Sequence, residues 1–82
     1  MKYFVYVIAS YKHSKIKTYV GYTNNLKKRL LLHNSGKGAK STKGRKWKLI
    51  YKEKYILKNK AMSREYHLKK NRKFRKQLIA KF

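Results

Sequence analysis

Two stretches near the N-terminus carry the clearest strand pattern in the chain. Residues 3–9 have the sequence Tyr-Phe-Val-Tyr-Val-Ile-Ala, an apolar run without polar alternation. Such a run indicates a central strand that is covered on both faces. Residues 18–22 are also rich in aromatic and β-branched side chains, and the polar segment 10–17 predicts a turn or an extended hairpin loop. We therefore expect an antiparallel pair in which Tyr6 and Tyr19 can come close together.

The second strand leads through a glycine into a helix. Residues 23–25, Thr-Asn-Asn, suit the N-cap of a helix expected over 25–34. Its core stripe is predicted to consist of three leucines, Leu26, Leu30 and Leu31. Arg29 and His33 are four residues apart, so they stack on one flank of the helix beside this stripe. We expect this pair to face the sheet edge and not bulk water.

The second half of the chain predicts a loop, a strand and two helices. Residues 35–46 hold three of the four glycines and no hydrophobic pattern, which predicts a mobile basic loop. Residues 47–57 predict a third strand with a bend near Glu53. The period becomes helical from Asn59, and residues 70–82 are compatible with a last helix. Its apolar positions are spaced at i, i+4 and i+8: Phe74, Leu78 and Phe82.

The predicted elements follow in the order β-β-α-β-α-α, without a repeat, a linker or a second domain. We expect one domain over residues 1–82. A chain of this length buries only about 60 % of its unfolded surface, so the core must be thin. The sequence has no cysteine, which excludes disulfides and thiolate metal sites.

Charge indicates the class of partner. The chain has 25 Lys and Arg against two acidic residues, with a formal net charge of +23. Nucleic acid is the expected partner of such a surface, and a merely solubilising coat is the alternative. The cations are spread over several elements, no apolar run approaches the ~20 residues of a membrane span, and the N-terminus lacks a signal-peptide pattern. We therefore expect a cytoplasmic protein that does not bind membranes.

Glu65 is the most informative single residue. It lies on the apolar stripe of its predicted helix, together with Ala61 and Leu68. A carboxylate in such a position is costly unless it is paired or bound to a metal. A salt bridge to Arg29 or to a lysine is one alternative, and coordination of a hard cation such as Mg²⁺ is the other. The second acid, Glu53, stands between two lysines and is expected to be a surface charge.

Two other features argue against particular sites. The three histidines, His13, His33 and His67, lack the spacing of zinc ligands, and we expect His13 and His67 to be solvated. The glycine-containing segment 36–42 lacks the residue order of a nucleoside-triphosphate loop. We expect this segment to hold nucleic-acid phosphates through its lysines and backbone amides.

An ordered set of short motifs extends over nearly the whole chain. The motifs are Phe4-Val5-Tyr6, Tyr19-Val20-Gly21, Asn25-Leu26-x-x-Arg29-x-x-x-His33-Asn34, Gly36-x-Gly38-Ala39-Lys40-x-Thr42, Trp47-x-Leu49-Ile50-Tyr51 and Ala61-x-x-x-Glu65. Together they resemble the GIY-YIG nuclease family, above all its small stand-alone members. Phe4 departs from the family pattern by replacing a glycine, the segment between Tyr6 and Tyr19 is longer than usual, and Gln77 stands where several members have asparagine.

The resemblance implies an α+β fold, with a three-stranded antiparallel sheet flanked by helices. It also implies a metal-dependent endonuclease that hydrolyses phosphodiester bonds in DNA, with DNA repair as a setting. Tyr6 and Tyr19 would line the site, and one of them would assist deprotonation of the attacking water. Arg29 would hold the scissile phosphate, with His33 near the nucleophile. Glu65 would bind one divalent ion, Mg²⁺ or Mn²⁺.

The nucleic-acid contacts and the alternative function follow from the same residues. A tyrosine has an ordinary pKa of about 10, and we expect Arg29, the nearby lysines and the metal to favour the phenolate and lower this pKa. Gly21 is expected to be structural. The cations predicted to bind nucleic acid are Lys27, Lys28, Lys37, Lys40, Lys43, Arg45, Lys69 and Arg72.

Duplex or branched DNA is the expected substrate, RNA is the alternative, and the protein is expected to be a monomer or a weak dimer. A non-catalytic basic protein that binds RNA or the ribosome is the competing function, but simple binding does not require the predicted site residues.

Overall fold

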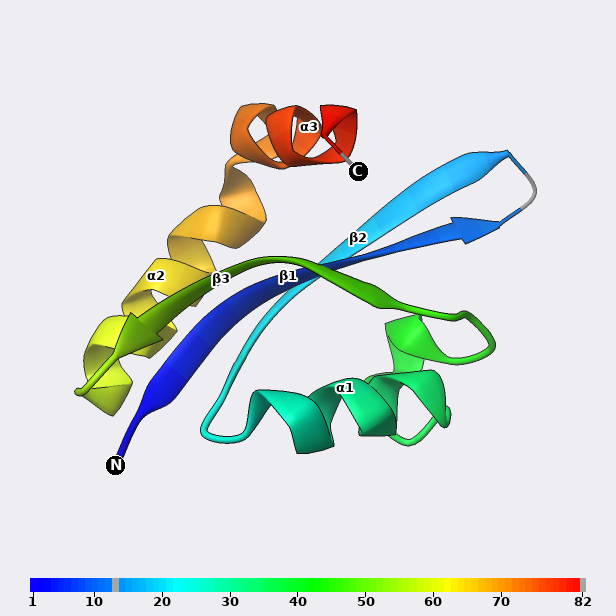
Figure 1. The fold of residues 1–82 in the computed structure, drawn as a ribbon. Helices are drawn as coiled ribbons and strands as arrows, with labels where there is room; N and C mark the ends of the chain where they lie inside the picture. The colour runs from blue at the N-terminus through cyan, green and yellow to red at the C-terminus, as the bar shows by residue number, and fades with distance from the viewer. Residues whose placement is uncertain (13, 82) are drawn as a thin grey trace.

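The fold is an antiparallel sheet with helices on both faces (Figure 1). The computed structural model describes residues 1–12 and 14–81. The strands are β1 (Tyr3–Lys12), β2 (Lys15–Thr23) and β3 (Lys48–Tyr55), arranged in the order β2-β1-β3. The helices are α1 (Leu26–Asn34), α2 (Lys58–Lys70) and α3 (Arg72–Ala80), with a short 3-10 helix, η1 (Lys40–Thr42), before β3. The predicted fold class and element order are confirmed.

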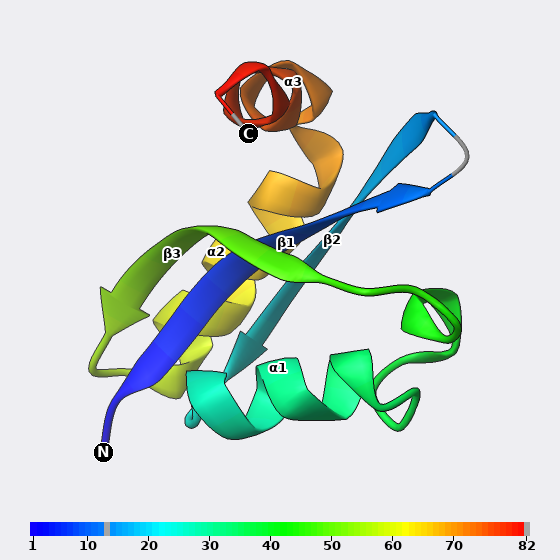
Figure 2. The same ribbon diagram turned by 45° about the vertical axis from the view of Figure 1, so that its right-hand side comes forward.

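The central strand β1 divides the core into two layers. Val5 and Val7 pack on one face against Ala61 and Leu68 of α2, and this cluster is the α2 layer. Tyr6 and Ile8 point to the other face, where they form the α1 layer with Trp47 and with Leu26 and Leu30 of α1. Residues 5–9 are all buried, as the continuous apolar run 3–9 predicts, and Ser10, which is predicted to lie in the polar segment, is buried as well. Figure 2 shows α1 and α2 on opposite sides of the sheet.

The β1–β2 hairpin differs from the prediction. Most of segment 10–17 is paired strand and not loop, because Tyr11 pairs with Ile16 and Lys12 with Lys15. The strands extend beyond the core here, so backbone pairing does not require apolar side chains. Ser14 has a φ of 64° in the connection, while His13, predicted to be solvated, lies outside the described residues.

Strand β3 has a register irregularity at Ile50, three residues before Glu53, near which a bend is predicted. Val7 pairs with Tyr51 and Ile8 with Leu49, which leaves Ile50 as an extra residue. Such a bulge allows two consecutive side chains to face the same side. Ile50 and Tyr51 accordingly both pack against the α2 layer, whereas Leu49 faces the α1 layer.

Helix α1 begins as predicted but has a different core stripe. The Asn25 side chain caps it by accepting a hydrogen bond from the backbone N–H of Lys28 at 3.1 Å. Leu31 is 63 % exposed, so its predicted place in the core is wrong. Leu26 and Leu30 do pack into the core, against Tyr6, Ile8 and Trp47, and His33 is the buried residue at the next turn.

The segment 35–46 has more structure than the expected mobile loop. It contains η1, and Thr42 at the end of η1 is fully buried. The Trp47 indole N–H donates to the Thr42 carbonyl at 2.9 Å, and the Asn34 side chain bonds both backbone groups of Trp47. Side-chain hydrogen bonds therefore hold a segment that has no hydrophobic periodicity.

Glu53 is part of an internal ion pair and not the expected surface charge. Arg64 of α2 donates to both of its carboxylate oxygens at 2.9–3.2 Å, and the hydroxyls of Tyr51 and Tyr55 also donate to it. Burial alone would raise the pKa of Glu53, but these hydrogen bonds outweigh it and hold the pKa at about 2. The pair joins β3 to α2.

The last helix closes the α2 face of the sheet. Phe74 and Leu78 pack against the α2 layer, and Phe74 contacts Tyr51 edge-to-face with ring centroids 5.1 Å apart. Phe82, predicted to continue this stripe, lies outside the described residues. Within residues 1–12 and 14–81, the structure has no helix of the length and apolar character needed to cross a membrane.

Candidate active site

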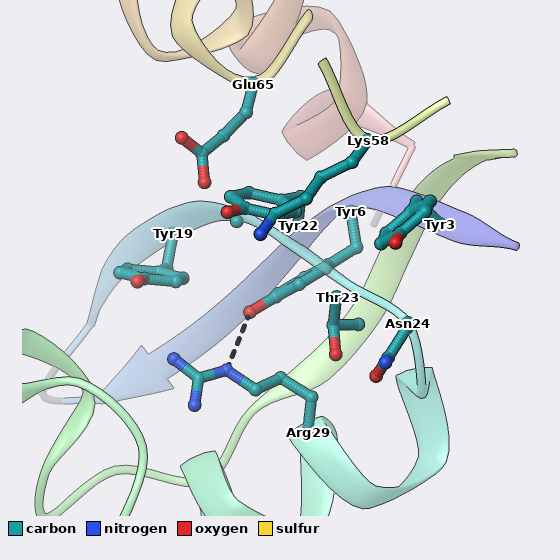
Figure 3. Close-up of a pocket in the computed structure, with 10 residues that line it drawn as sticks. Tyr3, Tyr6, Tyr19, Tyr22, Thr23, Asn24, Arg29, Lys58 and Glu65 are labelled. Carbon is teal, nitrogen blue, oxygen red and sulfur yellow. Dashed lines mark hydrogen bonds between the residues drawn. The ribbon is translucent and has the colours of Figure 1, made fainter. Parts of the chain in front are cut away.

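One open pocket of about 480 Å³ lies where the end of β2 meets α1 and α2 (Figure 3). Its walls come from β1, β2, α1, α2 and the link between β2 and α1: Tyr3, Tyr6, Tyr19, Gly21, Tyr22, Thr23, Asn24, Arg29, Lys58 and Glu65. Four of these were predicted from sequence to act together: Tyr6, Tyr19, Arg29 and Glu65. The structure thus brings two phenols, a guanidinium and a carboxylate into one place, while their chemical roles stay predictions.

Gly21 allows the Tyr6 ring to occupy this place. The two residues are direct partners across β1 and β2. A Cβ on Gly21 would lie 2.5 Å from the Tyr6 hydroxyl oxygen and 2.7 Å from the ring carbon that bears it, and 3.1 Å from the Tyr19 ring. A side chain at position 21 would therefore displace the phenol. The close approach of the Tyr6 ring explains why this position has a glycine.

Tyr6 and Arg29 form the charged centre of the pocket. The Arg29 Nε–H donates to the Tyr6 hydroxyl at 3.4 Å. Burial raises the pKa of Tyr6, and the nearby Arg29 offsets this rise only in part. Arg29 does lower the pKa of this tyrosine, as expected of a nearby cation, but desolvation is the larger effect, so the net shift is upward. The Tyr6 hydroxyl in turn raises the pKa of Arg29, which remains a cation.

His33 lies behind Tyr6 and not in the pocket wall. It is fully buried, its Nε2 is 2.8 Å from the Tyr6 hydroxyl, and its ring centroid is 5.0 Å from that of Tyr19. On the other side, its Nδ1 is 3.0 Å from the Thr42 hydroxyl. Burial, and then the positive charge of Arg29, lower the pKa of His33, so the imidazole is neutral at pH 7. His33 is therefore connected to the pocket by its hydrogen bond to Tyr6 and its ring contact with Tyr19.

Glu65 enters the pocket from α2, with its side chain 20 % exposed. Its ion-pair partner is Lys69, with Nζ 3.4 Å from Oε1, so the lysine and not Arg29 fulfils the predicted salt bridge. The described residues contain no group of three or more side chains that could enclose a metal ion. A single carboxylate beside open space fits Mg²⁺, which commonly keeps several waters and takes its other ligands from substrate phosphates.

Several pocket residues were not predicted from sequence. Lys58 opens α2 seven residues before Glu65, and Figure 3 shows it beside the pocket on the Glu65 side. Helical spacing from Glu65 could have identified it, because positions i and i+7 share a face. Asn24 was expected only as part of a cap, and Thr42 only as part of a phosphate-binding loop. No periodicity signals the contact between Thr42 and His33.

The predicted nucleic-acid-binding cations are spread over the molecule. Lys27 and Lys28 are exposed on α1 next to Arg29, and Lys69 pairs with Glu65. The remaining exposed ones lie in the loop before β3 and at the start of α3: Lys37, Lys40, Lys43 and Arg72. Arg45 instead donates to the Ser10 carbonyl at 3.2 Å and lies near the Trp47 ring, so its guanidinium is engaged inside the protein. Gln77 is exposed on α3 and is not among the residues that line the pocket.

Comparisons with known proteins agree on one family. A sequence model of the GIY-YIG catalytic domain matches residues 2–78. The chain is 40 % identical over 82 residues to the UPF0213 protein OB0043 of Oceanobacillus iheyensis, covering 99 % of this chain and 92 % of that protein. It is 44 % identical over 77 residues to the UPF0213 protein YazA of Bacillus subtilis, covering 93 % and 75 %. The solution NMR structure of the UPF0213 protein BH0048 from Bacillus halodurans superposes with a TM-score of 0.53 at 36 % identity, covering 98 % of this chain and 84 % of that one.

Proposed function

Because this chain belongs to the GIY-YIG family, we propose that it is a metal-dependent endonuclease that hydrolyses phosphodiester bonds in DNA. One observation carries this proposal: Tyr6, Tyr19, Arg29 and Glu65, from four different elements of the fold, line a single open pocket. Binding alone requires cations but does not require two phenols and a carboxylate at one position. Hydrolysis of a phosphodiester does need a positioned water, a proton acceptor and positive charge at the phosphate.

Arg29 is the group suited to the scissile phosphate. Its guanidinium is permanently charged and presents several N–H donors in one plane, which matches phosphate oxygens. The Nε–H is engaged with Tyr6, and Figure 3 shows the guanidinium reaching from α1 to the Tyr6 hydroxyl, with Tyr19 nearby. This arrangement would hold the phosphate next to the phenol and stabilise the charge that develops during hydrolysis.

The raised pKa of Tyr6 means that its hydroxyl is protonated at neutral pH. To take a proton from water, Tyr6 must therefore give up its own, and the neutral His33 Nε2 is 2.8 Å away. In the proposed step, water passes one proton to the Tyr6 oxygen while the Tyr6 proton moves to Nε2. The water oxygen forms a bond to phosphorus, the ester P–O bond breaks, and the leaving alkoxide takes a proton from solvent.

Glu65 would hold the divalent ion, Mg²⁺ or Mn²⁺, at the opposite side of the pocket. Such an ion supplies positive charge that offsets the negative charge on the transferring phosphate and leaving group. Glu65 would fix the position of this ion. Lys69, with its Nζ 3.4 Å from Oε1 of Glu65, holds the carboxylate in place. Lys58 lies at the same wall and would contact a neighbouring phosphate of the bound strand.

The proposed substrate is duplex or branched DNA, with RNA as the alternative, bound by a monomer or a weak dimer in the cytoplasm. The net charge of +23 supports a nucleic-acid partner. The same charge supports the competing function, a non-catalytic protein that binds RNA or the ribosome. A cleavage assay distinguishes the two functions, because non-catalytic binding does not require the pocket.

The test is incubation with single-stranded, duplex, nicked and branched DNA and with RNA, in Mg²⁺, in Mn²⁺ and in EDTA. We expect metal-dependent cleavage that falls at least about 100-fold in Glu65→Gln and in Arg29→Ala. Lys60→Ala is the matched control, because it removes an exposed cation of α2 that does not line the pocket. Tight binding without cleavage of any substrate would support the non-catalytic alternative, and equal rates in all variants would show that the pocket is not the active site.

A further inference from the structure

The segment 36–42, which is predicted to hold nucleic-acid phosphates, also packs against the His33 ring. A Cβ on Gly38 would lie 2.5 Å from His33 Nδ1, so the backbone passes as close to the imidazole as a glycine permits. Thr42 closes the other side, and both Thr42 and His33 are fully buried. The segment therefore contributes a hydroxyl to a hydrogen-bond chain that continues through His33 to Tyr6.

The contacts of Thr42 determine the direction of this chain. Its hydroxyl oxygen lies 2.9 Å from the Ala39 carbonyl, 3.2 Å from the Ala39 backbone N–H and 3.0 Å from His33 Nδ1. A hydroxyl has one proton, and a carbonyl oxygen can only accept. The Thr42 proton is therefore donated to the Ala39 carbonyl, and the lone pairs of Thr42 accept from the backbone N–H and from Nδ1–H. This allocation satisfies every group in the cluster.

We propose that Thr42 is a positioning residue that holds His33 in the tautomer with its proton on Nδ1, so that Nε2 accepts the hydrogen bond from the Tyr6 hydroxyl. The tautomer follows from the contacts of Thr42 alone, while its consequence for catalysis rests on the proposed function. With Nε2 as acceptor, the Tyr6 proton points away from the pocket, and the oxygen lone pairs face Arg29 and the attacking water. In the other tautomer, Nε2–H would donate to Tyr6, which could not pass a proton to His33.

Three variants separate positioning from packing. Thr42→Val keeps the shape and removes the hydroxyl, Thr42→Ser keeps the hydroxyl, and Ser41→Ala removes the exposed neighbouring hydroxyl as a control. Long-range ¹H–¹⁵N NMR spectra of the imidazole report the tautomer directly. We expect the Nδ1–H tautomer in wild type, Thr42→Ser and Ser41→Ala, and a shift toward Nε2–H in Thr42→Val. An Nε2–H tautomer in the wild type overturns the proposal, whether or not any variant folds.

Cleavage kinetics test the consequence. We expect Thr42→Val to lower kcat about 100-fold with KM unchanged, because proton transfer is lost while phosphate contacts stay. Thr42→Ser should restore the rate to within about 3-fold of wild type, which a packing role for the methyl group would not do. If Thr42→Val changes the tautomer but not kcat, the catalytic part is wrong. If no substrate is cleaved, the proposed function fails, and the NMR result still decides the tautomer.

Discussion

The hydroxyl of Tyr6 is the point on which most of the candidate site converges. Arg29 donates to it, His33 Nε2 lies 2.8 Å from it, and the missing side chain of Gly21 leaves room for it. These three neighbours act on different properties of the phenol, namely its charge environment, its proton and its position. Position can be perturbed alone, because Gly21 carries no functional group.

Gly21→Ala tests the positional requirement. Its methyl group would come within 2.7 Å of two atoms of the Tyr6 phenol, so the buried ring must move. We expect cleavage to fall at least about 10-fold and stability to fall by about 1–3 kcal/mol, the usual range for an added methyl in a packed core. Nuclease assays and urea unfolding measure the two effects. An alanine variant that cleaves at the wild-type rate would show that the Tyr6 position is not critical.

The identity of the pocket residues could be predicted from sequence better than their pKa values and hydrogen-bond partners. Tyr6, Tyr19, Arg29 and Glu65 lie in spaced motifs, so their convergence could be predicted from the family resemblance. The pKa of Tyr6 was predicted in the wrong direction, because burial cannot be judged from the neighbouring charges in the sequence. Thr42 was missed for a related reason, since a buried hydrogen bond from a loop leaves no periodic trace.

At the scale of elements, β3 and α2 are joined by the Glu53–Arg64 pair. Arg64 donates to both carboxylate oxygens, and two tyrosine hydroxyls complete the shell around them. The sequence shows Glu53 only as an acid between two lysines. Its partner lies eleven residues away on a different element, so the pair depends on how α2 packs against the sheet.

This ion pair predicts an acid-dependent stability. The pKa of Glu53 is about 2 in the folded protein, below the ordinary value of 4.5. The stabilisation is therefore present above pH 4.5 and is lost as the pH falls toward 2. Arg64 is partly exposed, so solvent reduces the effect to the order of 2 kcal/mol. Urea unfolding between pH 7 and pH 2 measures it.

Glu53→Gln is the matched variant for this measurement. We expect it to be less stable than wild type at pH 7 and to show little further loss between pH 4.5 and 2. Because the chain has only two acidic side chains, few other groups can produce this dependence. Parallel pH curves for the two proteins would mean that Glu53 is not the group responsible.

At the scale of the whole molecule, the order of elements and the two-layered core could be predicted from sequence. The unbroken apolar run of β1 requires cover on both faces, and α1 and α2 supply it. The hairpin and the segment before β3 could not be predicted. Their structure depends on backbone pairing beyond the core, as between Tyr11 and Ile16, and on side chains such as Asn34 that bond distant backbone.

The net charge of +23 leads to a prediction about how nucleic acid is bound. Each phosphate contact contributes about 0.9 to the slope of log K against log salt on duplex DNA. Lys27 and Lys28 are exposed on α1 beside Arg29, so we expect the double alanine variant to lower the slope by about 1.8 at most. Binding measured by fluorescence anisotropy from 50 to 300 mM KCl (roughly the range in which such slopes are resolved) gives this value.

Arg45 provides the matched comparison, because it is a cation whose guanidinium bonds the Ser10 carbonyl inside the protein. We expect Arg45→Met to leave the salt slope unchanged and to lower the free energy of unfolding by about 1 kcal/mol, the usual contribution of one hydrogen bond. The double alanine variant of Lys27 and Lys28 should lower the salt slope and leave the free energy of unfolding unchanged. If Arg45→Met lowers the slope as much as the α1 variant does, phosphate contacts would not follow the exposure of the cations, and bound DNA would have to displace Arg45 from its internal contacts.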